Sequence, residues 1–321
     1  MFTERGNGKV GLIGTGMVGA SFAYALMQSG MASELVLIDR DAQRAEGEAM
    51  DLNHGMAFVR PMHIVAGGYE RLAHSDVVVI CAGANQRPGE TRLDLLHKNA
   101  GVFVDIIPKV VAACPQAVIV IATNPVDILT HLSAELAGLP HGRVIGSGTL
   151  LDTARLRFNL GELLDVDPRS IHAWAVAEHG DSLVPVWSQA SIGGLPLKDF
   201  DRPGSPPPDA ATLQDVLQRT RKAGYEVIQR KQSTYYAIGL ALLKIVEAVL
   251  RDQRTVLTVS VPLQGRCGVD GMALSLPAVV GRNGIESVIE IPMNDEELAA
   301  FQASGQMLKN RLAEMAPSPP G

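Results

Sequence analysis

The chain has few cysteines, few aromatic residues and no excess of positive charge. Its 321 residues include 3 cysteines and 4% aromatics, and 28 Lys+Arg against 34 Asp+Glu give a formal net charge of -6. Cys81, Cys114 and Cys267 are widely spaced and form no CxxC pair, which predicts neither a disulfide framework nor a metal site. Free thiols are typical of a reducing cytosol. The acidic balance disfavours nucleic acid as the main partner, because a surface that follows phosphates carries a basic excess.

Long apolar runs are also lacking. No run reaches the roughly 18 residues of a membrane span, and residues 1–9 lack the apolar core of a signal peptide. We therefore expect no membrane partner and predict a cytoplasmic protein. A chain of this length can bury one large core or two medium ones.

The first 146 residues alternate short apolar runs with helical patterns. Helices are expected at 17–30 and at 92–114, the second with a kink at Pro108. The runs that look like buried strands are 9–13, 34–38, 76–81, 117–122 and 143–145. Such alternation is typical of parallel strands joined by helical crossovers, which predicts an α/β fold with a doubly wound, Rossmann-type sheet.

The second half mixes the two kinds of element in another order. We expect a mixed α/β domain at 147–321 after a Rossmann domain at 1–146, with the segment 234–250 packed back on the first domain. The expected helices are 150–163, a long pattern at 211–251 interrupted near 231–234, and 295–315. The expected strands are 170–178, 185–192, 255–261, 273–280 and 288–291.

A glycine-rich turn lies between the first predicted strand and the first predicted helix. It reads Gly14-Thr15-Gly16-Met17-Val18-Gly19, and Asp39 closes the next strand about 20 residues later. The glycines permit a tight turn and bring a pyrophosphate close to the helix N-terminus, where backbone N–H groups favour anions. Asp39 would accept hydrogen bonds from the adenine ribose and repel a 2′-phosphate. This context predicts NAD rather than NADP, although a glycine turn in another doubly wound fold would look similar.

Three residues of the second half form a candidate catalytic set. His179 lies in the stretch 177–182, while Asp152 and Arg155 are three residues apart and so share one face of a helix. A hydride can leave an alcohol carbon only if a base takes the hydroxyl proton and the substrate is held still. A histidine, a carboxylate to orient it and an arginine to bind an acid therefore favour oxidation of a 2-hydroxy acid. The plainer interpretations are a hydrogen-bonded strand-end histidine, a helix cap and a surface ion pair.

The sequence resembles the bacterial L-lactate dehydrogenases of the lactate/malate dehydrogenase superfamily over nearly its whole length. The matching blocks are 11–19, 82–92, 122–127, 146–155, 178–181 and 234–239. The resemblance implies that His179 is the acid/base, that Asp152 orients it and that Arg155 grips the substrate carboxylate. It also implies that the loop 85–92 closes over substrate and brings Arg92 to the carbonyl as the third catalytic residue.

The same resemblance assigns further binding residues and no metal. The substrate-binding residues that it implies are Gln86, Arg92, Asn124, Arg155 and Thr234. The cofactor-binding residues that it implies are Gly14, Gly16, Met17, Val18, Gly19, Asp39, Arg44, Tyr69, Gly83, Ala84, Ala122, Asn124, Ser147 and Ile238.

The choice between lactate and malate depends on Gln86. Malate enzymes of the superfamily place an arginine six residues before the catalytic arginine, to match a second carboxylate. A neutral Gln86 would leave that carboxylate unpaired in a dry site at a cost of several kcal/mol, so pyruvate and lactate are favoured. Arg87 keeps a malate dehydrogenase or a relaxed 2-hydroxy-acid dehydrogenase open as an alternative, since a one-residue shift would bring it to the same place. A cofactor-sensing binding module would be expected to lack part of the catalytic set.

Arg157 and His172 form a second candidate site. Arg157 lies two residues beyond Arg155, about 200° around the helix, and so points away from the substrate. In bacterial relatives an arginine and a histidine at matching positions of facing subunits bind fructose 1,6-bisphosphate as an activator. Paired cations repel each other until a multivalent anion bridges them. The resemblance thus implies a homotetramer activated by this effector; a pair of ordinary surface charges is the alternative.

Overall fold

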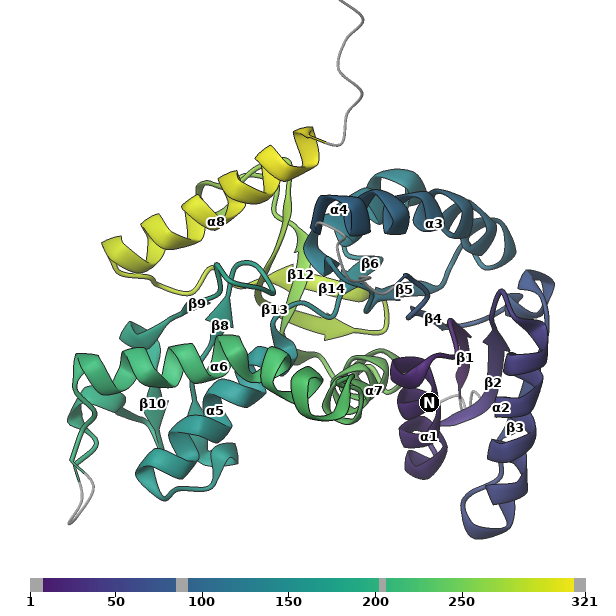
Figure 1. The fold of residues 1–321 in the computed structure, drawn as a ribbon, viewed down its shortest axis with the longest axis horizontal. Coiled ribbons are helices and arrows are strands. Elements are labelled where there is room, and N and C mark those ends of the chain that lie inside the picture. Colours follow the sequence, from purple (N-terminus) through teal and green to yellow (C-terminus); the bar gives the residue numbers. More distant parts are fainter. Residues whose placement is uncertain (1–7, 85–91, 202–205, 315–321) are drawn as a thin grey trace, which may run out of the picture.

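The computed structural model in Figure 1 describes residues 8–84, 92–201 and 206–314. Its centre is a nine-stranded sheet in the order β14-β13-β12-β6-β5-β4-β1-β2-β3. Six strands pair in parallel: β1 (Gly8–Ile13), β2 (Ala32–Ile38), β3 (His63–Ala66), β4 (Val77–Ile80), β5 (Val118–Ile121) and β6 (Val144–Gly146). The order 3-2-1-4-5-6 is that of a dinucleotide-binding Rossmann sheet, so the predicted fold class is confirmed.

Three strands of the second half extend the same sheet. They are β12 (Thr255–Pro262), β13 (Ala273–Gly281) and β14 (Gly284–Val288), all paired antiparallel. The antiparallel strands join the parallel strands where Ser260 on β12 pairs with Gly146 on β6. The other strands are short: β7 (Ile171–His172), β8 (Ala175–Val176), β9 (Val184–Pro185), β10 (Ser191–Ile192) and β11 (Leu195–Pro196).

Helices cover both faces of the parallel strands. The α-helices are α1 (Met17–Ser29), α2 (Ala42–His54), α3 (Arg92–Ala113), α4 (Val126–Ala137), α5 (Leu150–Leu164), α6 (Ala210–Lys231), α7 (Tyr236–Leu250) and α8 (Asp295–Ala313). The 3₁₀ turns are Gly55–Phe58, Tyr69–Leu72, Pro168–Ser170, Trp187–Gln189, Leu197–Asp199 and Arg266–Gly268. Figure 1 shows α3 and α4 on one side of the strands β4 to β6, and α1 and α7 on the other.

The two faces explain the apolar strand sequences. Val77 and Val79 of β4 are buried in one core, together with residues of α1 and α7, while Val78 and Ile80 are buried in the other, together with Phe103 of α3. Successive side chains of a strand point to opposite faces, so a strand that is covered on both faces must be apolar throughout.

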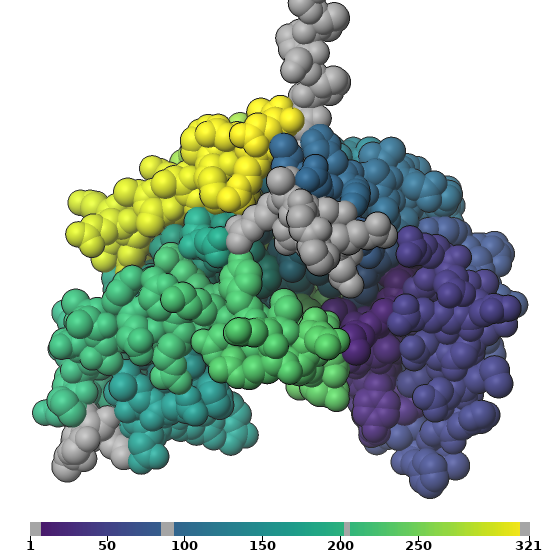
Figure 2. Space-filling model, viewed as in Figure 1, coloured from purple at the N-terminus to yellow at the C-terminus, as the bar shows by residue number. Residues whose placement is uncertain are grey.

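The segment 234–250 packs back on the first half, as the sequence predicted. An ideal Cβ on Gly239 of α7 would lie 3.1 Å from backbone atoms of Ser21 and Phe22 of α1, which places the two helices in very close contact. Figure 2 shows the green surface of α7 meeting the purple surface of α1. The expected break between α6 and α7 is also present, because Gln232 ends α6 in the left-handed conformation with φ 68°.

Several strand predictions were wrong in detail. The last strand covers 284–288 rather than 288–291, because Gly284, with φ +90°, closes a tight hairpin with Gly281. The run 170–178 is two short strands, since the chain changes partner from β10 to β9 between them. The edge strand β3 was not predicted; it has only four residues, HIVA, of which three are apolar, and this run is too short to indicate a strand.

Candidate active site

The glycine turn leaves room for a pyrophosphate at the start of α1. Gly14 has φ +95°, and an ideal Cβ there would lie 2.4 Å from the backbone nitrogen of Ala82; on Gly19 it would lie 2.0 Å from the carbonyl oxygen of Gly14. A Cβ on Gly16 would meet nothing within 4 Å. Gly16 is the N-cap of α1 and makes no side-chain capping bond. The first-turn N–H groups of Met17 and its neighbours therefore lie at an open helix end, which suits a phosphate group.

Asp39 lies directly beyond β2 and joins that strand end to the glycine turn. Its Oδ2 accepts hydrogen bonds from the backbone N–H of Thr15 at 2.7 Å and from the Thr15 hydroxyl at 3.1 Å, and its Oδ1 accepts from the N–H of Asp41 at 3.0 Å. Burial alone would raise the pKa of Asp39, but these bonds and the charge of Arg44 bring it below the ordinary value. The side chain is thus a fixed anion where the sequence predicted the ribose, and a 2′-phosphate would be repelled.

Several of the other predicted cofactor residues follow the carboxyl ends of the central strands. Ala122 and Ser147 come directly after β5 and β6, while Ile238 is in the first turn of α7. Gly83 and Ala84, after β4, are exposed. Since the carboxyl ends of parallel strands share one edge, these residues border the crevice where this fold binds dinucleotides. Arg44 lies exposed on α2, and Val18 and Tyr69 are half-buried.

Asn99 organises this edge and was missed by sequence reasoning. It is 1% exposed on α3. Its Oδ1 accepts the N–H of Ala84 at 2.7 Å, and its Nδ2 donates to the carbonyl oxygen of Asn124 at 2.8 Å. Asn99 therefore holds together the loops after β4 and β5. The available signal was an amide on the apolar face of a predicted helix, because a buried polar group needs partners.

His179, Asp152 and Arg155 come together as the sequence predicted. The His179 Nδ1 lies 2.5 Å from Asp152 Oδ2, and Arg155 Nη1 donates to Asp152 Oδ1 at 3.0 Å. Asp152 is 4% exposed, while the His179 side chain is 26% exposed. A carboxylate only accepts, so Nδ1 carries the proton and Nε2 is left to act on a substrate.

The pKa values within this set are shifted in opposite directions. The negative charge of Asp152 raises the pKa of His179, against the opposing effects of burial and of the charge of Arg155. Burial would raise the pKa of Asp152, but the charges of His179 and Arg155 hold it below its usual value. The arrangement favours an imidazolium next to a carboxylate, which suits a group that must deliver a proton near neutral pH.

A second carboxylate holds the backbone of His179. Asp127, in the first turn of α4, is 2% exposed. Its Oδ2 accepts the backbone N–H of His179 at 2.8 Å, and its Oδ1 accepts the hydroxyl of Ser260 at 2.6 Å. Asp127 lies in one of the blocks that resemble the family, but the sequence predicts no role for it.

The loop that carries His179 is also tied to the C-terminal helix, α8. Glu178, 6% exposed, accepts hydrogen bonds from the N–H and hydroxyl of Ser182, and from Nη1 of Arg311 at 3.1 Å. The backbone N–H of Glu178 donates to the hydroxyl of Ser304 at 3.3 Å. Arg311 and Ser304 lie on α8, so this helix holds the loop in addition to Asp127. These residues were also missed.

Of the predicted substrate residues, some are placed and some lie outside the described part. Asn124 is exposed after β5 and before a cis peptide bond to Pro125, and Thr234 is half-buried between α6 and α7. The guanidinium of Arg155 faces Gly224 of α6, where an ideal Cβ would lie 3.9 Å from Nη1 and Nη2. Gln86 and Arg87 lie outside the described residues, and of Arg92 only the backbone, at the start of α3, is described.

The Arg157 side chain lies against the backbone of Ala173, the residue that follows His172. Arg157 Nε donates to the carbonyl oxygen of Ala173 at 3.1 Å, and the guanidinium lies 5.0 Å from the ring centre of Trp174. Burial lowers the pKa of Arg157. His172 is exposed on β7. The Arg157 guanidinium thus lies close to the backbone next to His172.

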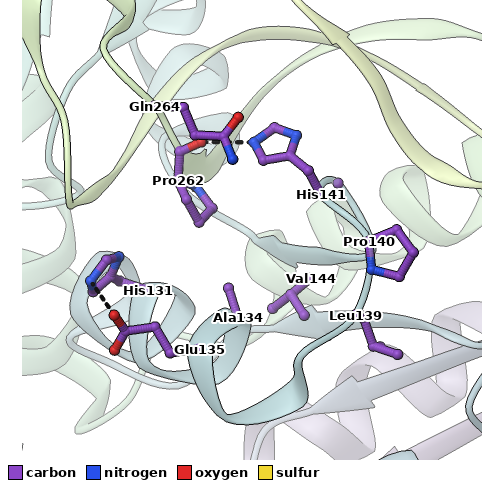
Figure 3. A pocket seen from close by; sticks show the side chains of 10 residues that line it. His131, Ala134, Glu135, Leu139, Pro140, His141, Val144, Pro262 and Gln264 are labelled. Atoms are coloured by element: carbon purple, nitrogen blue, oxygen red, sulfur yellow. Dashed lines mark hydrogen bonds and ion pairs between the residues drawn. The ribbon is translucent and has the colours of Figure 1, made fainter.

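A separate pocket lies at the C-terminal end of α4, and its lining includes none of the predicted site residues (Figure 3). His131 Nε2 lies 3.5 Å from Glu135 Oε1, and His141 Nε2 lies 2.9 Å from the carbonyl oxygen of Pro262.

Within residues 8–84, 92–201 and 206–314 no cluster of three or more His, Cys, Asp or Glu could hold a metal ion. No helix in these ranges is long and apolar enough to cross a membrane.

Comparisons with known proteins agree with this geometry. Residues 8–146 match the family described as lactate/malate dehydrogenase, NAD binding domain, and residues 149–317 match lactate/malate dehydrogenase, alpha/beta C-terminal domain. An L-lactate dehydrogenase of Bacillus caldolyticus is 48% identical over 311 residues, covering 97% of this chain and 98% of that protein. One from Thermoanaerobacter sp. (strain X514) is 45% identical over 307 residues, covering 96% and 99%.

A solved structure is similar over the same length. The minor L-lactate dehydrogenase from Enterococcus mundtii, in a ligand-bound form, superimposes with a TM-score of 0.93 at 40% sequence identity, and the match covers 97% of this chain and 99% of that one. With the Rossmann sheet, the open glycine turn and the His179–Asp152 pair in place, these matches establish that the chain is a member of the lactate/malate dehydrogenase family of NAD-dependent oxidoreductases.

Proposed function

We propose that this protein is an L-lactate dehydrogenase, which interconverts pyruvate and NADH with L-lactate and NAD⁺. The observation that carries the proposal is the joined set of His179, Asp152 and Arg155, which supplies a proton donor, a carboxylate to orient it and a cation for the substrate carboxylate. The names of the relatives at 45% and 48% identity support the same substrate.

The residues divide the reaction between them. When bound, NADH supplies the hydride that reduces the carbonyl carbon. Asp152 fixes Nδ1–H of His179, so that Nε2 donates its proton to the carbonyl oxygen, which becomes the hydroxyl of lactate. Arg155 binds the substrate carboxylate and thereby fixes the reacting carbon. In the direction of lactate oxidation, Nε2 accepts the hydroxyl proton instead.

We further propose the division into a cofactor domain at 1–146 and a catalytic domain at 147–321. In this scheme the predicted glycine-turn and strand-end residues bind NAD, Arg92 joins His179 and Asp152 in catalysis, and the remaining predicted substrate residues line the pocket. The fit of a pyrophosphate to the open end of α1 at Gly16 supports the cofactor assignment.

The preference for pyruvate over oxaloacetate is assigned to Gln86, with a malate or relaxed 2-hydroxy-acid dehydrogenase as the alternative if Arg87 reaches the pocket. Steady-state oxidation of NADH by the purified protein, with pyruvate and with oxaloacetate as substrates, tests this choice. A kcat/KM at least tenfold higher for pyruvate supports the proposal. A higher value for oxaloacetate would assign the malate activity.

We also propose a cytoplasmic homotetramer that fructose 1,6-bisphosphate activates through Arg157 and His172. The closeness of the Arg157 guanidinium to the backbone beside His172 supports a joint anion site. Sedimentation velocity and pyruvate saturation curves near neutral pH, with and without the bisphosphate, test it. An unchanged oligomeric state and an unchanged KM would reject the effector site.

A further inference from the structure

Asp127 connects three parts of the molecule directly behind the catalytic histidine. It lies on α4, two residues after the cis peptide bond that follows Asn124. One carboxylate oxygen accepts the N–H of His179 on the catalytic loop, and the other accepts the hydroxyl of Ser260 on β12. The backbone of His179 is thereby fixed to the helix that begins at the cofactor edge.

The loop that carries His179 is also anchored at Ala177, two residues before the histidine. Ala177, with φ 71°, exchanges two backbone hydrogen bonds of 3.0 Å with Ser275 of β13. The Asp127 bond then fixes the peptide of His179 itself, while Asp152 fixes its ring. The direction of Nε2 depends on both, because a side chain can be aimed only from a fixed backbone.

Hydrogen bonding alone does not require a carboxylate here. An asparagine could accept the N–H of His179 with its oxygen and donate its amide to the Ser260 hydroxyl. A buried carboxylate costs free energy that the amide would not cost. Burial indeed raises the pKa of Asp127 to about 7, against the lowering effects of Ser260 and His179. A carboxyl group at this position, which is ionised above about pH 7, is explained if its negative charge is used.

The charged groups around His179 come from four elements. Asp152 and Arg155 face it from α5 and Asp127 from α4, while Glu178 of its own loop is paired with Arg311 of α8. The negative charge of Asp127 adds to that of Asp152 in raising the pKa of His179.

We propose that Asp127 is a positioning residue of the active site, which fixes the peptide of His179 and whose negative charge helps to keep the imidazole protonated for the reduction step. The inference rests on the proposed function for its consequence in turnover. Its effect on His179 can be measured in the free protein, without cofactor or substrate.

The test compares Asp127→Asn with a matched control, Ser133→Ala. Ser133 is equally buried on α4, and its hydroxyl has no hydrogen-bond partner among the described residues. Acylation of His179 by diethyl pyrocarbonate, followed peptide by peptide by mass spectrometry across pH, reports the neutral imidazole. In Asp127→Asn we expect the midpoint at lower pH and severalfold faster acylation on its acid side, and in Ser133→Ala no change.

Turnover gives a second readout. The fall of kcat/KM for pyruvate at high pH should move to lower pH in Asp127→Asn, with NADH affinity unchanged. Ser260→Ala provides a variant that keeps Asp127 but removes one donor to it, and a smaller shift in the same direction is expected.

The outcomes separate the two proposals. An unchanged His179 midpoint in folded Asp127→Asn and Ser260→Ala proteins would overturn the role of Asp127. If Asp127→Asn does not fold, the Ser260→Ala midpoint decides alone. A wild-type protein that does not reduce pyruvate would reject the proposed substrate, while the acylation midpoints would still decide the positioning role.

Discussion

Replacing Asp152 by asparagine should separate the effect of its negative charge on His179 from the effect of its shape. Asp152 is 4% exposed and touches both His179 and Arg155, so the amide would fill the same space without the charge. Opposite unit charges about 4 Å apart, at an effective dielectric constant of about 20, attract by about 4 kcal/mol, or about a thousandfold in an equilibrium constant. The His179 side chain is 26% exposed, and solvent weakens this attraction. We therefore expect kcat/KM for pyruvate to fall by about 30- to 1000-fold.

The pH profile of kcat/KM shows in which direction Asp152 shifts the pKa of His179. Asp152 raises the pKa of His179, and pyruvate reduction needs the protonated ring, so the wild-type rate falls as pH rises through that raised pKa. In Asp152→Asn the fall should begin at lower pH. The acid limb for lactate oxidation, which needs the neutral ring, should move in the same direction.

Steady-state kinetics in both directions across pH, with circular dichroism to verify folding, measure these shifts. Asp167→Asn is the control, because Asp167 is exposed near the end of α5 and its side chain bonds only Arg169 in the described structure. If folded Asp152→Asn keeps kcat/KM within about threefold of the wild type and an unshifted limb, the charge of Asp152 does not act on His179 and the reasoning is refuted.

Two further variants test the supports of the site. Arg311→Met removes the cation next to the buried carboxylate of Glu178. Since the Arg311 side chain is 36% exposed, we expect the free energy of unfolding, measured by urea denaturation, to fall by only about 1–2 kcal/mol. Adding Glu178→Gln should recover part of this loss. A loss below about 0.3 kcal/mol would show that the pair carries no stability. Gly19→Ala places a Cβ 2.0 Å from the Gly14 oxygen and should weaken NADH binding at least tenfold by fluorescence titration. Gly47→Ala, whose Cβ meets nothing within 4 Å, should leave binding unchanged, and equal affinity in both variants would contradict the packing argument.

The parts of the site that residue patterns predicted are those encoded by short spacing, whereas the pairing of His179 with Asp152, 27 positions apart, followed from the family resemblance. The glycine turn lies within six consecutive residues, and Asp152 and Arg155 are one helical turn apart. The parallel strands were predictable because a strand that is buried on both faces is apolar throughout, as β4 is.

The parts that sequence did not predict are contacts between distant residues. Asp127 and His179 are 52 positions apart, and the bonds from Ser260 to Asp127 and from Arg311 to Glu178 each span 133 positions. Nothing local in the chain specifies such pairs. The same is true of the join between β6 and β12, since the pattern of β12 predicts a strand but not which sheet it extends.

The central claim is that His179 transfers the proton as pyruvate is reduced. The most direct measurement is kcat/KM for pyruvate in the wild type and in His179→Gln, with the dissociation constant of NADH measured for both. We expect a loss of at least about a thousandfold in kcat/KM, with NADH affinity within about twofold of the wild type. A variant that binds NADH normally and keeps kcat/KM within about threefold would contradict it.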